Sequence, residues 1–141
     1  ELVRRGWLRW MLVWVKDRAP FTHADYHTQH EPIGYGWVPG GPHAPVVDRT
    51  KTTVLRHDKP QVSAGHPSMK PVPLLRELLA NHALPAGALV LEPFAGSGST
   101  LVAAHEEGLR CWAVETDPRY CQVILDRWRD GTGLEPVQVR G

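Results

Sequence analysis

Leu89-Val90-Leu91-Glu92-Pro93-Phe94-Ala95-Gly96-Ser97-Gly98-Ser99-Thr100 is the most informative segment of the chain, because an apolar strand runs directly into a glycine turn and a helix start. Gly96 and Gly98 allow backbone conformations that a Cβ disfavours, and they let the main chain approach a ligand closely. A second apolar run, 111–114, ends at Glu115, nineteen residues after Gly96. A β-α-β cofactor fold places the acid that binds ribose hydroxyls at this point. The two linked signals predict a nucleotide-type cofactor site.

The class of cofactor follows in part from what the turn lacks. A dinucleotide fingerprint has a third glycine where this chain has Leu101, and no Gly-Lys-Ser or Gly-Lys-Thr follows for a phosphate loop. We expect a helix from about Thr100 until Gly108 stops it, with Ser99 or Thr100 as its cap. The free N–H groups at its start favour a carboxylate or phosphate. An adenosyl cofactor with a carboxylate tail fits these features.

Three segments together resemble the amino-group DNA methyltransferases, which modify adenine N6 or cytosine N4. They are His66-Pro67-Ser68-Met69-Lys70-Pro71-Val72, the glycine stretch 92–100, and Val114-Glu115-Thr116-Asp117-Pro118-Arg119-Tyr120-Cys121. The family has His-Pro-Thr-x-Lys-Pro, Asp-Pro-Phe-x-Gly-Ser-Gly-Thr-Thr and Glu-x-Asp-x-x-Tyr in this order. The order is that of the permuted beta-type class, in which the catalytic motif comes earlier in the chain. Weaker likeness extends over nearly the whole chain.

The resemblance implies an α/β, Rossmann-like methyltransferase fold, S-adenosylmethionine as cofactor and double-stranded DNA as partner. Lys70 would then offer positive charge to the carboxylate of the cofactor, although His66-Pro67 also fits a rigid turn that starts a helix. Phe94 would flank the cofactor, although an aromatic residue after a strand is commonly core. The cofactor-binding residues implied by the resemblance are His66, Lys70, Glu92, Phe94, Gly96, Ser97, Gly98, Ser99, Thr100 and Glu115.

The catalytic motif of the family is absent from this sequence. That motif is an Asp, Asn or Ser followed by Pro-Pro and an aromatic residue, and no Pro-Pro pair occurs in the 141 residues. In the family the loop orients the target amine and stacks on the extruded base. We therefore assign no catalytic residue and expect the chain to be the carboxyl-terminal part of a site-specific methyltransferase, inactive without its N-terminal segment. The alternatives are a non-catalytic remnant or cofactor-binding module of phage or restriction-modification origin, and an RNA or small-molecule methyltransferase.

Composition limits the remaining possibilities. A chain of 141 residues with 42% hydrophobic content can bury a single core, so we expect one partial domain. The net charge of +1 gives no case for nucleic-acid binding, and DNA as partner depends on the resemblance. Cys111 and Cys121 form neither a disulfide framework nor a metal knuckle, which indicates a reducing cytoplasm. No apolar run approaches the ~20 residues of a membrane span. The sequence leaves the oligomeric state open, with a homodimer as one alternative.

The patterns also predict an order of elements. Residues 1–40 form a hairpin region with strands at 10–15 and 33–38, residues 41–65 form a loop, and residues 66–133 form the cofactor-binding β-α-β region. That last region holds a helix at 72–82, strands at 88–91 and 111–114, and a closing helix at 119–129. Trp7, Trp10 and Trp14 also fit an apolar stripe on a helix, and we expect all three to pack in the core. His23, His27 and His30 have the spacing of metal ligands, but they lack a helical apolar stripe, so we interpret them as part of a polar loop. Asp117 is expected to begin the closing helix together with Pro118.

Overall fold

The structure is a computed structural model that describes residues 1–21, 23–60 and 69–136. Three strands come first along the chain and are followed by helices that alternate with strands, so the predicted α/β class is confirmed. The chain divides into two compact units, one formed by residues 1–59 with 81–83 and the other by residues 60–80 with 84–141. Each unit has its own small sheet.

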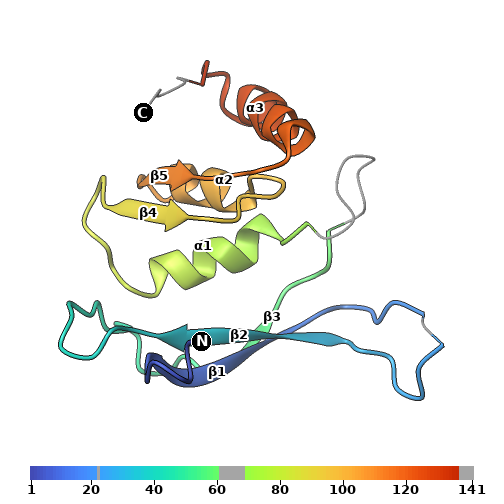
Figure 1. Cartoon of the computed structure of the whole chain (residues 1–141), viewed down its shortest axis with the longest axis vertical. Helices are drawn as coiled ribbons and strands as arrows, with labels where there is room; N and C mark the ends of the chain where they lie inside the picture. Colours follow the sequence, from blue (N-terminus) through green and yellow to red (C-terminus); the bar gives the residue numbers. More distant parts are fainter. Residues whose placement is uncertain (22, 61–68, 137–141) are drawn as a thin grey trace. The chain divides into compact units, whose positions relative to one another are not determined.

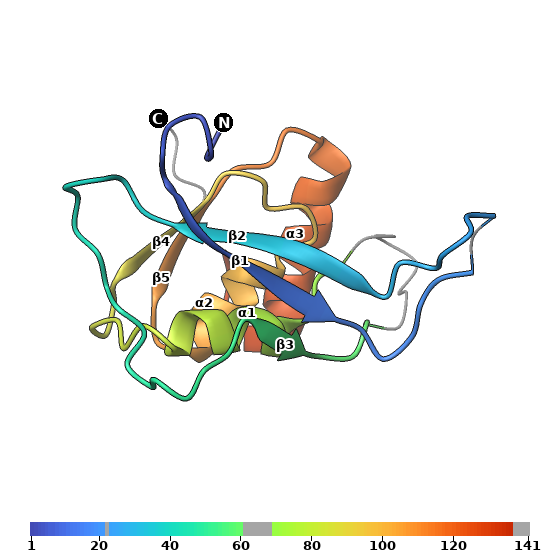
Figure 2. The ribbon, with the colours of Figure 1, turned by 90° about the horizontal axis from the view of Figure 1, so that it is seen from below.

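The first unit is a three-stranded sheet in the order β2-β1-β3 (Figures 1 and 2). Strand β1 (Leu8–Val15) pairs antiparallel with β2 (His30–Gly36), which confirms the predicted hairpin. Strand β3 (Val54–Arg56) pairs parallel to β1. The interpretation of residues 41–65 as a loop missed β3, because three residues are too few to leave a period-2 pattern in the sequence.

Trp14 forms the centre of the first unit. Its side chain is 2% exposed, it pairs with Leu55 of β3, and its Nε1 donates to His57 O at 2.7 Å. Core packing is therefore confirmed for Trp14, on a strand rather than on the alternative helix. The same expectation is wrong for Trp10, which is 52% exposed and lies against the rings of Tyr35 and Trp37.

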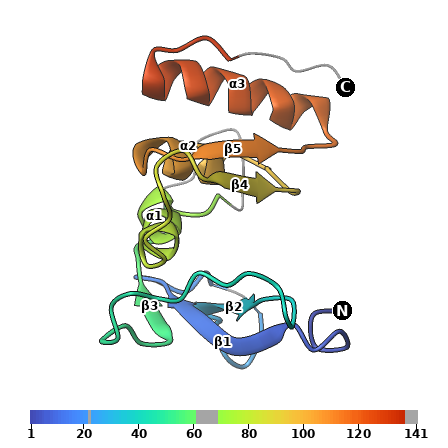
Figure 3. The same ribbon diagram turned by 90° about the vertical axis from the view of Figure 1, so that its left-hand side faces the viewer.

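The second unit is a β-α-β arrangement extended by two helices (Figure 3). Strand β4 (Leu89–Glu92) and strand β5 (Arg110–Ala113) are parallel, and helix α2 (Ser99–Glu106) connects them and contacts both. Helix α1 (Val72–Ala80) and helix α3 (Pro118–Thr132) each contact α2. Ala103 and Ala104 of α2 are fully buried, so α2 is the centre around which this unit packs.

The predicted elements of this unit are present, with ends that differ by a few residues. Helix α1 ends two residues before the expected His82, and α3 continues three residues beyond the expected end until Gly133, whose φ is 69°. Asp117 begins α3 as predicted, because its Oδ1 accepts from Arg119 N at 2.9 Å and Pro118 follows it. No helix within the described ranges is long and apolar enough to span a membrane. Nor does the described part of the chain gather three metal-ligating side chains.

Candidate functional site

The glycine turn between β4 and α2 is the structural centre of the candidate site. Gly96 and Gly98 have φ values of 53° and 75°, and Gly98 N donates to Ala95 O at 2.8 Å. Both residues therefore occupy the left-handed region that glycine adopts without strain. The tight turn brings the end of β4 directly onto the first turn of α2.

The expectation that Ser99 or Thr100 caps α2 is wrong. The helix begins at Ser99, its N-cap is Gly98, and no side chain makes a capping hydrogen bond. Both hydroxyls are engaged elsewhere: Ser99 Oγ donates to Lys70 O at 2.9 Å, and Thr100 Oγ1 donates to Glu92 Oε2 at 2.7 Å. The first N–H groups of α2 therefore keep the partial positive charge of an uncapped helix start.

Glu92 connects the two ends of the turn. One carboxylate oxygen accepts from Phe94 N at 2.9 Å, and the other accepts from Thr100 Oγ1. The side chain of Glu92 thus holds the turn in shape from its position at the end of β4. Phe94 itself is 86% exposed, so the alternative in which it is a core residue is wrong.

Glu115 connects the turn to the strand beside it. Glu115 Oε2 accepts from Gly96 N at 2.8 Å, while Oε1 accepts from Thr116 N at 2.8 Å and from Asp117 N at 2.9 Å. These backbone N–H groups, those of Asp117 and Gly96 first, hold the pKa of the Glu115 carboxyl below its usual value. A carboxylate has about four acceptor positions, so about one remains for an incoming hydroxyl.

Arg127 of α3 is a site residue that the sequence interpretation missed. Its Nη1 donates to Ser97 O and to Ser99 Oγ, each at 3.0 Å, and lies 3.3 Å from Ser97 Oγ. Burial lowers the pKa of its guanidinium, while Ser97 and Ser99 are 6% and 4% exposed. The available signal was a basic residue on the apolar face of the helix, between Ile124 and Trp128.

The remaining predicted residues contribute unequally. Lys70 meets the turn through its backbone oxygen, which accepts from Ser99, and its side chain is exposed. His66 lies outside the described residues. Cys111 lies on β5, and burial together with the charge of Glu92 raises the pKa of its thiol to about 11. The turn, Glu92 and Glu115 are therefore the part of the prediction that the structure brings together.

This arrangement suits a ligand with one anionic group and one hydroxyl-bearing group. The uncapped start of α2 attracts an anion, Glu115 retains acceptor capacity for a hydroxyl, and Phe94 offers an exposed ring beside them. Gly96 is only partly buried and carries no side chain, so a ligand can approach the backbone of the turn at that residue. No residue of the turn is placed as a nucleophile.

Comparisons with known proteins give a consistent result. The N6/N4 methyltransferase family described as DNA methylase matches residues 37–126. A curated protein of Escherichia coli K12, "Putative methylase YubD", is 47% identical over 55 residues, which are 39% of this chain and 24% of that protein.

Among the solved structures that are similar in fold, two illustrate the match. The first is a "Putative DNA Modification Methylase" from Thermus thermophilus in complex with S-adenosyl-L-methionine, with a TM-score of 0.63 and 27% identity, covering 88% of this chain and 54% of that one. The second is the PvuII DNA methyltransferase (cytosine-N4-specific), with a TM-score of 0.72 and 14% identity, covering 86% of this chain and 51% of that one. The chain spans about half the length of each solved protein.

Proposed function

The chain belongs to the DNA methylase family, and on this basis we propose that it is the cofactor-binding part of an S-adenosylmethionine-dependent DNA methyltransferase acting on adenine N6 or cytosine N4. Family membership confirms the resemblance that the three motifs indicated. The observation that carries the proposal is the turn between β4 and α2, which is held by hydrogen bonds to the carboxylates of Glu92 and Glu115.

The residues present fit this cofactor. Its methionine carboxylate suits the uncapped start of α2, and its adenine ring suits the exposed ring of Phe94. Glu115 would accept a ribose hydroxyl, and binding both hydroxyls requires it to release at least one backbone N–H. Lys70 belongs to the proposed set through its motif, and so does His66, which lies outside the described residues. The bound cofactor supplies an activated methyl group, and these side chains orient it.

We further propose that a catalytic segment with the Pro-Pro-aromatic motif acts together with this chain. The face of the β4–β5 pair opposite α2 is apolar and open: Leu91 and Trp112 are paired in register and are 66% and 65% exposed. Leu89 and Val114 extend this face, with 43% and 53% exposure. Parallel sheets are ordinarily covered on both faces, so an additional segment would find a ready surface here.

The proposed substrate is double-stranded DNA, and the proposed location is the cytoplasm. The substrate follows from family membership, since the related proteins are named as DNA methylases, and the location follows from the two free cysteines, Cys111 and Cys121. We also propose that the protein acts in a restriction-modification system and that it forms a homodimer. Methylation of tRNA in preference to duplex DNA would contradict the choice of substrate.

Calorimetric titration with S-adenosylmethionine tests the cofactor site. We expect the Gly96→Val and Glu115→Ala variants to lose binding, because the first adds a side chain at a φ of 53° and the second removes the acceptor for Gly96 N. Gly108→Val is the matched control, since Gly108 has a φ of 68° but lies after α2 with nothing within 4 Å of an added Cβ. The control is expected to bind normally, and unchanged binding by both site variants would remove the assignment.

A further inference from the structure

Arg127 makes contacts that the proposed chemistry does not explain. Its guanidinium lies on α3, yet the hydrogen bonds from Nη1 go to Ser97 and Ser99 on either side of Gly98. All of these acceptors are neutral oxygens, and within the described part of the chain desolvation is the cause that shifts its pKa. A partly buried cation held only by neutral groups gains less than it would from a carboxylate partner. An apolar side chain would pack at this position without that cost.

The same helix contacts the turn a second time. A Cβ on Gly98 would lie 3.2 Å from both Cγ1 and Cγ2 of Ile124, so α3 and the turn are already in close approach there. Ile124 and Arg127 are three residues apart and therefore lie on one face of α3. Trp128 continues this face with an edge-on contact to His105 of α2, at 4.9 Å between ring centroids. Helix α3 thus packs against the turn, while Glu92 and Glu115 accept hydrogen bonds from it at the ends of the strands.

We propose that Arg127 is a positioning residue of the cofactor site, which fixes residues 96–99 in the conformation that receives S-adenosylmethionine. The inference deepens the proposed function and depends on it for the identity of the ligand. Ser97 O and Ser99 Oγ are separated by the left-handed Gly98, so a donor that binds both fixes the backbone across the most deformable residue of the turn. Arg127 does not touch the cofactor in this account, and its effect passes through the turn.

The test combines a readout without ligand and a readout with ligand. The Arg127→Met variant keeps the packing stem but removes the hydrogen bonds, and we expect amide hydrogen exchange in residues 96–99 to become about tenfold faster. Its affinity for S-adenosylhomocysteine is expected to fall about tenfold, with a smaller fall for 5′-methylthioadenosine, which lacks the carboxylate that the start of α2 would receive. Arg127→Lys is expected to restore part of both losses, because an ammonium retains some of the donors.

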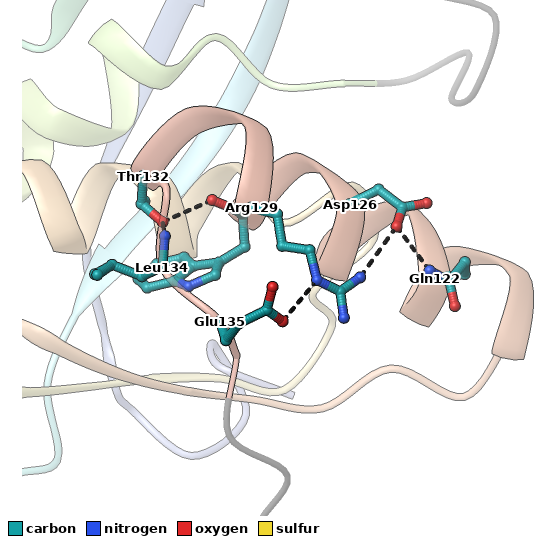
Figure 4. A network of polar contacts seen from close by, with 7 residues as sticks. Gln122, Asp126, Arg129, Thr132, Leu134 and Glu135 are labelled. Carbon is teal, nitrogen blue, oxygen red and sulfur yellow. Dashed lines mark hydrogen bonds and ion pairs between the residues drawn. The ribbon is translucent and has the colours of Figure 1, made fainter.

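Arg129 provides the matched control on the same helix (Figure 4). Arg129 Nε donates to Glu135 Oε2 at 2.9 Å, and Nη1 lies 3.4 Å from Asp126 Oδ1, in an exposed network on another face of α3. We expect Arg129→Met to leave exchange in the turn and both affinities unchanged. If Arg127→Met does not fold, Ser99→Ala removes one of the acceptors and replaces it in the test.

Two outcomes would overturn the inference. The first is unchanged exchange in residues 96–99 of the Arg127→Met variant, which together with a loss of affinity would mean that Arg127 contacts the ligand directly. The second is faster exchange with unchanged ligand affinity, which would make the position of the turn irrelevant to binding. If the unaltered chain binds neither ligand, the proposed function fails, while the exchange measurement still decides whether Arg127 holds the turn.

Discussion

Gly98→Ala is expected to destabilise the second unit by about 2 kcal/mol, from two separable causes. The φ of Gly98 is 75°, and holding an alanine there costs about 1 kcal/mol. The added Cβ would also lie 3.2 Å from both Cγ atoms of Ile124, and moving α3 away costs about 1 kcal/mol more. Urea denaturation followed by circular dichroism measures the sum, provided that the transition is two-state.

Gly108→Ala separates the two causes. Gly108 has nearly the same φ, 68°, but nothing lies within 4 Å of an added Cβ, so its variant is expected to lose only about 1 kcal/mol. In an Ile124→Ala background the cost of Gly98→Ala is expected to fall to that of Gly108→Ala, because the clashing atoms are gone. Equal costs for the two glycines in the unaltered background would refute the close packing of α3 against the turn.

Three other perturbations have defined outcomes. The pKa of Glu115 is lower in the folded chain than its unfolded value of 4.5, so its carboxylate stabilises the fold above pH 4.5. This stabilisation is lost as the pH falls through the lower folded pKa. The melting temperatures of the unaltered chain and of Glu115→Gln should therefore converge below pH 4.5. With a thiol pKa of about 11, about a thousandth of Cys111 is thiolate at pH 8. Iodoacetamide should therefore label Cys111 far more slowly in the folded chain than after unfolding, and peptide mass spectrometry measures the two labelling rates. Arg76→Met breaks exposed ion pairs to Glu106 and Glu107 at 3.0 Å and 2.7 Å, so urea denaturation should give a loss below about 1 kcal/mol that shrinks in high salt.

The sequence predicted the second unit well because its signals are local. A strand, a glycine turn, a helix and a second strand follow one another within residues 89–114, and each has its own pattern of apolar residues or glycines. Glu92 and Glu115 could be selected for the same reason, since both stand at strand ends. The hydrogen-bond partners of Glu115 could not be predicted from the sequence, because they are backbone N–H groups that no pattern of side chains encodes.

The misses share a physical cause, which is competition between local and distant partners. Ser99 is a good cap by residue type, but its hydroxyl binds Lys70 O, 29 residues away in the chain. Arg127 reaches the turn across 30 residues, and β3 gains its pairing from β1 rather than from its own composition. Trp10 has the periodicity of a core residue, but its ring lies against Tyr35 and Trp37 on an exposed side. These choices depend on tertiary structure.

The most direct test of the cofactor site is a titration of the isotope-labelled chain with S-adenosylhomocysteine, followed by amide chemical shifts in nuclear magnetic resonance. We predict saturable shifts concentrated at residues 92–100 and 114–117, where the turn, Glu92 and Glu115 meet. ATP and NAD at the same concentrations should produce smaller changes there, because the turn lacks both the Gly-Lys-Ser/Thr of a phosphate loop and the third glycine of a dinucleotide fingerprint. A folded chain whose amides do not shift, or shift only within residues 1–59, would contradict the account.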